Sequence, residues 1–184
     1  MSESEELRVL FVQYDRVHFL LNRTQCASSL FASEVQEVGS RHRYLHELLR
    51  VGGRRLLFFD LQLFLRETFR ARGSAGAQLA VIGELSGFER RTRELFRSSV
   101  FPRLGRLELD TERIAFRIPS NTVMKSLKPD ELEPHNLSIR RPLAARGVLA
   151  VHPTEESMGF LLDLDLLVGS RLLFAGAGRK EESE

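Results

Sequence analysis

Short runs of bulky apolar residues alternate with polar breaks along most of the chain. Valine and phenylalanine recur in these runs, with a tyrosine in the first, and these residues favour the pleated, half-buried surface of a β-strand. The clearest runs are 7–14, 16–21, 54–65, 146–153 and 158–169. The pattern predicts a mainly β protein, with a tight hairpin at Asp15 between the first two runs.

Two of these runs share one pattern, in which an apolar strand leads into an Asp-Leu step. They read "RRLLFFDLQLFL" (54–65) and "MGFLLDLDLLVG" (158–169). A hairpin-like segment precedes each, 7–21 in the first half and 106–118 in the second, where Asp110 to Glu112 are expected to form the turn. This order of elements predicts two similar halves.

A few segments have helical rather than strand periodicity. In "RHRYLHELLRV" (41–51) the apolar residues fall at helical spacing, and Gly52-Gly53 ends the segment. In "SGFERRTRELFRSSVFP" (86–102) one side of the expected helix carries Phe88, Thr92, Leu95, Phe96 and Ser99, and Pro102 is expected to end it. The short segment "EVQEV" (34–38) alternates instead, which directs Val35 and Val38 inward.

Residues 66–102 differ in character from both halves and are expected to be an insert. "RARGSAGA" is typical of a flexible linker, "QLAVIGEL" (78–85) is a candidate for one further strand, and the arginine-rich helix follows. If this is an insert, deleting 70–100 should leave the fold intact.

Composition narrows the class of protein. The chain has 184 residues with 42% hydrophobic residues, and its longest apolar run is far shorter than the ~18 to 20 residues of a membrane span. The acidic start "MSESEEL" is unlike a secretory signal, and Cys26 has no disulfide partner because it is the only cysteine. We therefore expect a cytoplasmic protein.

Net charge argues against a dedicated nucleic-acid-binding protein. The formal charge is only +2, and the aromatic residues lie in apolar runs rather than among exposed basic residues.

Candidate catalytic groups have simpler structural explanations. His42 and His46 stand four residues apart, but a third metal ligand is missing from the pattern, so we interpret them as the solvent-facing side of a helix. Asp163 and Asp165 are paired carboxylates that suit acid–base chemistry, yet an aspartate at a strand end more often caps the next helix, which is the interpretation we favour. The sequence predicts no enzyme, no metal site and no cofactor.

The order of these segments resembles the CheW-like coupling proteins of bacterial chemotaxis. "FVQYDRVHFLL" is similar to the opening hairpin of that family, "EVQEV" to its next strand, and "RVGGRRLLFFDL" to its first Asp-Leu segment. "RIAFRIPSNTVMKSLKPDELEP" and "RGVLAVHPTEESMGFLLDLDLLV" are similar to its second half. The resemblance covers residues 7–174 apart from the central insert.

The resemblance implies two packed five-stranded β-barrels with a few short helices and a helical insert, within a single domain at 7–174. We expect the first barrel at about 7–65 plus closing elements, the insert at 66–102 and the second barrel at about 103–174. Residues 1–6 and 175–184 are expected to be disordered.

The resemblance also implies a non-catalytic adaptor role. The partners would be the regulatory domain of a CheA-type histidine kinase and the cytoplasmic tips of chemoreceptors, with no small-molecule substrate. The protein would be cytoplasmic or peripheral at inner-membrane receptor arrays. The kinase-binding surface would contain Val35, Glu37, Arg50, Gly53 and Arg54.

Several positions depart from the family pattern. Gly52 stands where an arginine is usual before the conserved glycine, Leu57 replaces a proline, and Pro119 replaces an aspartate. These departures weaken the inference of standard contacts and leave open a second function, in which the fold binds another partner. Arg90, Arg91, Arg93 and Arg97 would then contact an acidic protein, a membrane surface or a nucleic acid, unless they are simply solvated.

Overall fold

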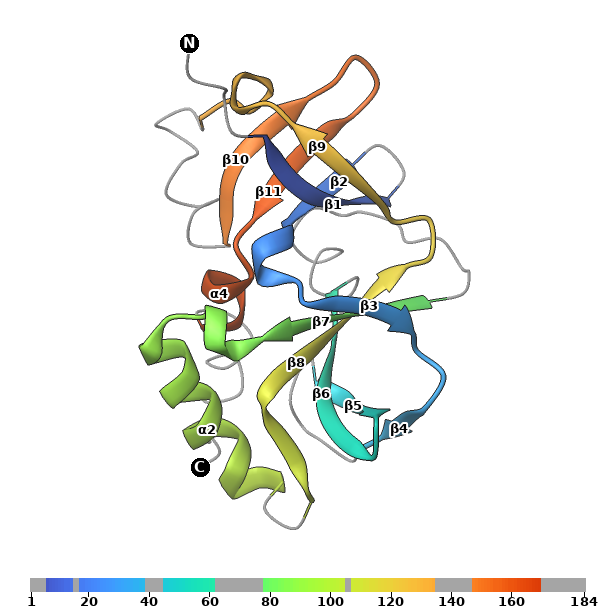
Figure 1. Cartoon of the computed structure of the whole chain (residues 1–184), viewed down its shortest axis with the longest axis vertical. Coiled ribbons are helices and arrows are strands. Elements are labelled where there is room, and N and C mark those ends of the chain that lie inside the picture. The colour runs from blue at the N-terminus through green and yellow to red at the C-terminus, as the bar shows by residue number, and fades with distance from the viewer. Residues whose placement is uncertain are drawn as a thin grey trace, which may run out of the picture.

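The computed structural model describes residues 6–14, 17–38, 45–61, 78–104, 107–134 and 147–169, and in these residues the protein is mainly β (Figure 1). The strands are β1 (Leu7–Tyr14), β2 (Val17–Asn22), β3 (Ser28–Phe31), β4 (Val35–Glu37), β5 (Leu45–Val51), β6 (Arg54–Asp60), β7 (Gln78–Glu84), β8 (Leu109–Pro119), β9 (Val123–Leu127), β10 (Val148–Pro153) and β11 (Met158–Leu162). The helices are α2 (Arg90–Leu104), α4 (Leu164–Leu167) and the 3-10 turns η1 (Arg23–Gln25), η2 (Leu85–Gly87) and η3 (Pro129–Glu131).

The first sheet forms a small barrel, which we call barrel A. Its strand order is β10-β11-β2-β1-β9, and only the β11–β2 pairing is parallel. The chain leaving β9 passes through η3, and Glu133 then forms a β-bridge with Val151 of β10. This bridge joins the two edges of the sheet and so closes the barrel. The expected hairpin at Asp15 is confirmed, because Tyr14 pairs with Val17 across a two-residue connection.

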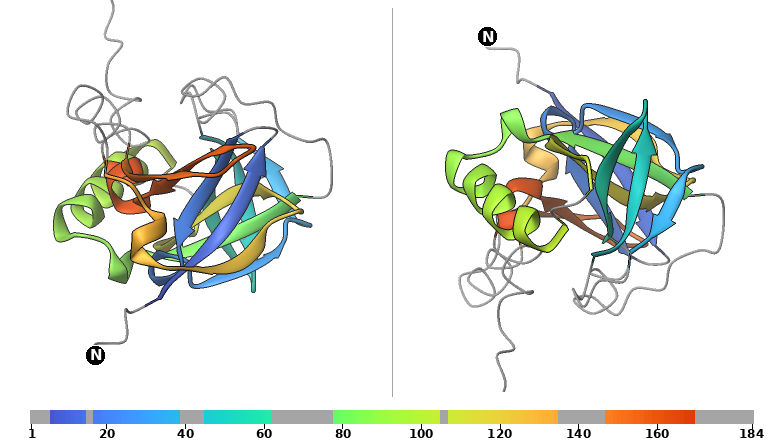
Figure 2. Two further views of the ribbon diagram at one scale, coloured as in Figure 1. Left: turned by 90° about the horizontal axis from the view of Figure 1, so that it is seen from above. Right: turned by 90° about the horizontal axis from the view of Figure 1, so that it is seen from below.

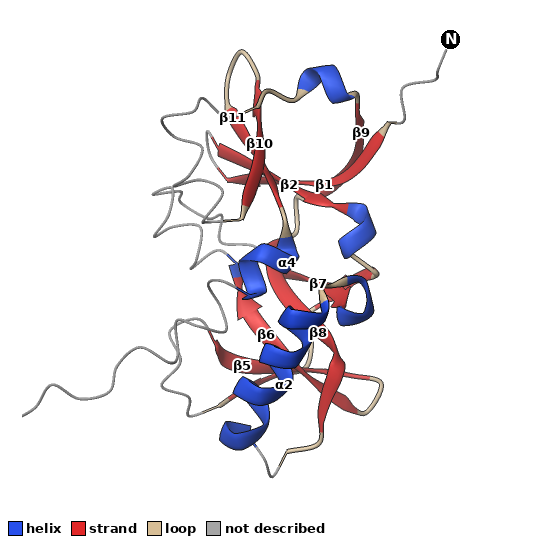
Figure 3. Cartoon of the chain, turned by 90° about the vertical axis from the view of Figure 1, so that its left-hand side faces the viewer, coloured by secondary structure: helices blue, strands red, loops and turns tan. Residues whose placement is uncertain are grey.

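The second sheet, barrel B, closes in the same way. Its order is β3-β7-β8-β6-β5-β4, and only the β6–β8 pairing is parallel. The chain runs from β3 into β4 within three residues, so one continuous segment pairs with β7 on one side and β5 on the other. Counted this way, each barrel has five strand positions, which confirms the expected fold class. Figure 3 shows the two barrels stacked along the long axis of the molecule.

The expected repeat exists, but each repeat is shared between the barrels. Hairpin β1–β2 corresponds to hairpin β7–β8, and hairpin β10–β11 corresponds to β5–β6, with the same parallel pairing in each barrel. Barrel A therefore takes its first hairpin from the start of the chain and the rest from the end. This corrects the expected division into a first barrel at 7–65 and a second at 103–174.

The segment expected to be an insert is partly structural. β7 lies between β3 and β8 in barrel B, so it is the first strand of the second repeat. Among the described residues of this segment, η2 and α2 are added within the connection between β7 and β8. The helix also runs past Pro102, where it was expected to end, to Leu104.

Two further expectations are wrong. Residues 45–51 form strand β5 rather than part of a helix. Residues 109–119 form one long strand, β8, rather than a hairpin turning at Asp110 to Glu112. In each strand a break in pairing register disturbs the period-two pattern: between Leu45 and Glu47 in β5, and opposite Arg55 to Leu57 in β8.

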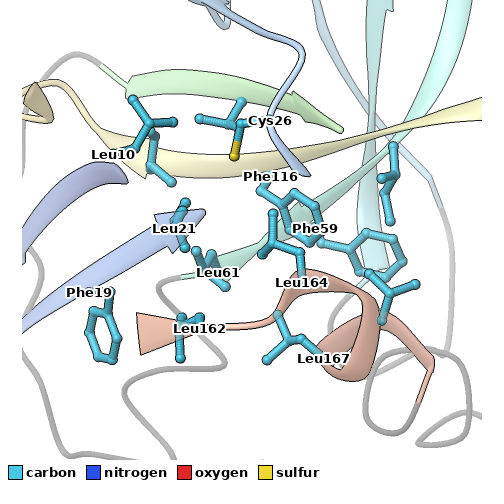
Figure 4. Close-up of a cluster of buried hydrophobic side chains, with 14 of the residues drawn as sticks. Leu10, Phe19, Leu21, Cys26, Phe59, Leu61, Phe116, Leu162, Leu164 and Leu167 are labelled. Atoms are coloured by element: carbon cyan, nitrogen blue, oxygen red, sulfur yellow. The ribbon is translucent and has the colours of Figure 1, made fainter. Parts of the chain in front are cut away.

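Three apolar clusters stabilise this arrangement. The largest lies between the barrels and includes Phe19, Phe59, Phe96, Phe116 and Leu164 (Figure 4). Each barrel also has its own interior cluster, around Phe11 and Leu20 in barrel A and around Leu49 and Phe58 in barrel B. The two barrels therefore share one core and are not independent domains.

The junction between the barrels is also fixed by polar contacts. The side chain of Asp163 accepts hydrogen bonds from the backbone N–H groups of Asp165 and Leu166, which makes it the N-cap of α4. Gln25 donates to Asp163 over 2.8 Å and accepts from the N–H of Leu164. Asp165 accepts from the N–H of Glu89 over 2.7 Å and thereby holds the start of α2. The capping interpretation of Asp163 is confirmed, and Figure 2 shows α4 beside α2 on one side of the barrels.

Several sequence predictions lie outside the described residues. These are the disordered ends at 1–5 and 175–184, the linker at 70–77, and His42 together with the side chain of His46. Among the described residues, no helix is long and apolar enough to cross a membrane.

Candidate functional site

The five residues predicted to bind a kinase lie together on three neighbouring strands of barrel B. Val35 and Glu37 belong to β4, Arg50 to β5 and Arg54 to β6, while Gly53 is in the turn between β5 and β6. We call this region, together with Phe31, the β4–β6 surface. In Figure 1, β4 lies toward the end of barrel B farthest from barrel A, whereas β3, which carries Phe31, lies on the side nearer barrel A.

The apolar part of this surface is small and exposed. Val35 lies opposite the buried Leu49 and so shares its face of the sheet, yet it keeps 36% exposure, whereas Val38 packs on the shared core as predicted. Phe31 of β3 is 67% exposed, the most exposed large apolar side chain among the described residues. Sequence analysis missed Phe31, although the alternation along "SLF" could have found it: Leu30 packs into barrel B, so its neighbour must point outward.

The turn at one edge of the surface requires glycine. Gly52 and Gly53 have φ angles of 56° and 81°, and two successive positive φ angles are typical of a type I′ hairpin turn. Gly52, which stands where the family pattern has an arginine, therefore lies in the left-handed region. Gly52 adopts that region without the steric cost that an arginine would carry.

Arginines surround the turn. Arg50 lies directly opposite Arg55 in the β5–β6 pairing, an arrangement that is unfavourable for two like charges. Arg50 is 3.8 Å from the carboxylate of Glu34, and both side chains are largely exposed. This pair contributes little to stability and leaves Arg50 accessible.

Arg54 is held by a buried carboxylate. The side chain of Asp110 accepts from the N–H groups of Glu112 and Arg113 and from the guanidinium of Arg113. Arg54 approaches the same carboxylate at 3.7 Å. Burial alone would raise the pKa of Asp110, but these hydrogen bonds and the two arginines outweigh it and lower the pKa.

The arginines of the alternative surface are spread along α2. Arg90 pairs with Glu94 over 2.7 Å, and Arg97 pairs with Glu112 of β8 over 2.5 Å. Arg91 is exposed and Arg93 is half-buried. Phe96 on the opposite side of the helix packs into the shared core, as the sequence predicted, and Phe88, which precedes the helix, packs there too.

The described residues offer little catalytic chemistry. They contain no group of three or more His, Cys, Asp or Glu side chains placed to hold a metal ion. Cys26 is buried, and burial raises its pKa to about 12, so its thiol stays protonated and unreactive at neutral pH. Asp163 caps α4, while Asp165 accepts from the N–H of Glu89 through Oδ2 and its buried Oδ1 has no hydrogen-bond partner.

Comparison with known proteins supports the fold. No protein-family model and no curated protein matches the sequence. Among solved structures, the chain is similar to the scaffolding protein TtCheW from Thermoanaerobacter tengcongensis. The TM-score is 0.60 at 10% sequence identity, and the match covers 90% of this chain and 89% of TtCheW. The protein therefore has a CheW-like fold.

Proposed function

We propose that this protein is a non-catalytic adaptor in a chemosensory two-component pathway, which couples chemoreceptors to a CheA-type histidine kinase. The observation that carries the proposal is the shared two-barrel fold, which matches a scaffolding protein over nearly the full length of both chains. The sequence resemblance, found in the same order of segments, supports the same role. The adaptor would act in the cytoplasm and would be held at the membrane only by binding to its receptors.

The β4–β6 surface is the proposed kinase-binding site. It combines the exposed apolar side chains of Phe31 and Val35 with the charges of Glu37, Arg50 and Arg54. Glu37 shares the sheet face of Val35, and Arg50 points to the other face beside the turn. A small exposed apolar area with charged residues nearby suits a transient interface of about 800 Å² or less per partner. The opposed pair Arg50 and Arg55 would gain from carboxylates on the partner, since these would offset their mutual repulsion.

Calorimetry with the regulatory domain of the CheA-type kinase from the same genome tests this proposal. We expect a one-to-one complex, weakened in Glu37→Lys by more than the ~0.5 kcal/mol of an ordinary surface substitution. The substitution is suited to the test because Glu37 lies opposite Glu47. A lysine there removes a like-charge pairing, so the fold should tolerate it.

The matched control is Glu94→Lys, which makes the same charge change on the exposed side of α2. It should bind the kinase domain like the wild type. A complex that is insensitive to Glu37→Lys would move the interface elsewhere, and absence of binding at tens of micromolar would reject this kinase domain as the partner.

Binding to a receptor needs a separate measurement. Cosedimentation with membranes containing the chemoreceptor from the same genome should carry the protein into the pellet, and soluble receptor tip fragments should compete for it. Protein that stays in the supernatant would contradict the receptor half of the proposal.

The alternative partner is an acidic protein, a membrane surface or a nucleic acid bound through α2. Its arginines are less available than the sequence suggested, because Arg90 and Arg97 are paired with Glu94 and Glu112. Replacing both Arg90 and Arg91 with glutamate would abolish such binding, and Glu37→Lys would not affect it. Anionic vesicles and single-stranded DNA are the probes.

A further inference from the structure

Two histidines are hydrogen-bonded to each other inside barrel A. His18 of β2 lies on the same strand face as Leu20, which belongs to the interior cluster of the barrel. Its Nε2 is 2.8 Å from Nδ1 of His152 on β10. His18 is fully buried and His152 is only 9% exposed.

The pair also holds the loop that joins β10 to β11. Nδ1 of His18 is 3.0 Å from the hydroxyl of Ser157. That hydroxyl is 2.8 Å from the hydroxyl of Thr154, which in turn accepts from the N–H of Ser157. One polar chain therefore runs from His152 through His18 to the loop.

The surroundings favour neutral imidazoles. The ring of His18 stacks on Phe11 at 4.5 Å between centroids, and the ammonium of Lys125 lies 3.7 Å from the centroid of that same Phe11 ring, on β9's side of the barrel. The positive charge of Lys125 acts on both histidines, and the negative charge of Glu131 of η3 acts on His152. Gly159 leaves room for the ring, since a Cβ there would lie 2.0 Å from Nε2 of His18.

Counting protons shows how the pair responds to acid. Two neutral imidazoles place one hydrogen between Nε2 of His18 and Nδ1 of His152, whichever ring donates. One added proton can be carried at an outer nitrogen without breaking this bond. A second added proton puts hydrogens on both facing nitrogens, so the bond is lost and two positive charges face each other beside Lys125.

We propose that the His18–His152 pair is an acid-sensitive latch, which holds hairpin β10–β11 and its loop onto β2 at neutral pH and releases them on protonation. These hydrogen bonds involve no residue of the β4–β6 surface in barrel B. The latch therefore does not depend on the proposed adaptor function.

The direction of the pH effect follows from burial. Desolvation, followed by the neighbouring His152 and Lys125, lowers the pKa of His18 to about 4 from 6.5. Desolvation also lowers the pKa of His152, against the opposing effect of Glu131. Since the folded pKa lies below the unfolded pKa, stability is complete above about pH 6.5 and is lost as pH falls toward 4. For His18 alone, the folding equilibrium constant should fall roughly 20-fold between about pH 7 and pH 5.

Histidine titration by NMR is the first test. The chain has five histidines. We expect two of them, assigned to His18 and His152, to titrate below the ordinary range, and the amide signals of Thr154 and Ser157 to move with them. The proposal would be overturned if both histidines titrated near 6.5, or if the amide signals of Thr154 and Ser157 did not change with their titration.

The second test is urea unfolding at about pH 7 and about pH 5. It compares the wild type with Ser157→Ala and with the double variant His18→Leu/His152→Leu. Replacing both polar partners by apolar side chains removes the titration without leaving an unpaired group. The double variant should lose much less stability on acidification than the wild type. Ser157→Ala should keep the wild-type dependence of stability on pH but free the loop at neutral pH. The folded pair stays neutral over this pH range, so the slope measures how strongly folding resists protonation of the two histidines. Equal slopes in wild type and double variant would mean that folding does not resist it, which would refute the latch. If the double variant does not fold, the NMR titration still decides.

Discussion

Arg117 and Glu47 form an ion pair across barrel B, between strands β8 and β5 that do not neighbour each other. The guanidinium also lies 3.9 Å from Asp60 of β6 and 4.9 Å from the ring centroid of Phe58. The side chain of Arg117 is only 17% exposed. Near the other end of β8, Arg54 and Arg113 both contact the carboxylate of Asp110 and form a second ionic cluster. The apolar interior of barrel B therefore lies between two sets of paired charges.

Replacing Arg117 should therefore destabilise the fold strongly. Arg117→Met leaves two carboxylates together with no positive charge, and loss of one partner from a buried ion pair costs about 3 to 5 kcal/mol. Because Glu47 and Asp60 keep some exposure, we expect the lower end of this range. Urea unfolding measures the change. Arg117→Met/Glu47→Met should recover part of it, and equal losses in single and double variants would contradict the coupling.

Asp110→Asn tests the second cluster and its pH dependence. Hydrogen bonds to a charged group contribute about 1.5 to 3 kcal/mol each, so we expect a loss of about 2 kcal/mol at neutral pH. The pKa of Asp110 is lower in the folded state, so its contribution is complete above the unfolded pKa of about 3.9 and disappears as pH falls below it. Wild type and variant should therefore converge in acid. The control Glu112→Gln, whose side chain is 58% exposed, should change stability by less than about 1 kcal/mol.

Sequence patterns found several strands, including β10 despite its register break between Val148 and Ala150, but failed for β5 and β8. β1, β2, β7, β10 and β11 were predicted within a few residues, as was the capping role of Asp163. In β5 the register break between Leu45 and Glu47 shifts the apolar positions into helical spacing. In β8 the carboxylate of Asp110 binds the next backbone N–H groups as it would in a turn, but the chain does not reverse.

The exchange of hairpins between barrels could not be predicted, because it depends on contacts distant in sequence. Nothing local in "QLAVIGEL" distinguishes a strand of an insert from a strand lying between β3 and β8. The residues of the candidate surface lie on neighbouring strands because they are close in sequence, and their role in binding stays a prediction. Its most exposed apolar residue, Phe31, was missed because it lies outside the EVQEV motif, which begins three residues later.

Gly53→Ala distinguishes two roles of this glycine, its backbone conformation in the turn and a contact with the proposed partner. The φ angle of 81° places an alanine in the left-handed region, which costs roughly 1 to 2 kcal/mol, although space around the position is open. We expect a corresponding drop in the urea midpoint, while Gly52→Asn, with a residue that tolerates this region, should lose less. Because the added methyl group meets no neighbour, kinase binding should persist in the folded fraction. A complete loss of binding with unchanged stability would show that the partner contacts the glycine itself.

Deleting residues 70–100 should unfold the protein, contrary to what an insert would predict. The deletion removes β7 from between β3 and β8, and it removes Phe88 and Phe96 from the shared core. Each buried phenylalanine alone is worth about 3 to 5 kcal/mol, comparable with a large part of a typical domain's stability. Circular dichroism and amide NMR spectra should show loss of the native state. Replacing Arg90 and Arg91 with glutamate should leave the same spectra unchanged, because Arg91 is exposed and the Arg90–Glu94 pair is a surface contact worth little. A folded deletion variant would mean that barrel B closes without β7. The assignment of β7 and β8 as the first hairpin of the second repeat would then be wrong.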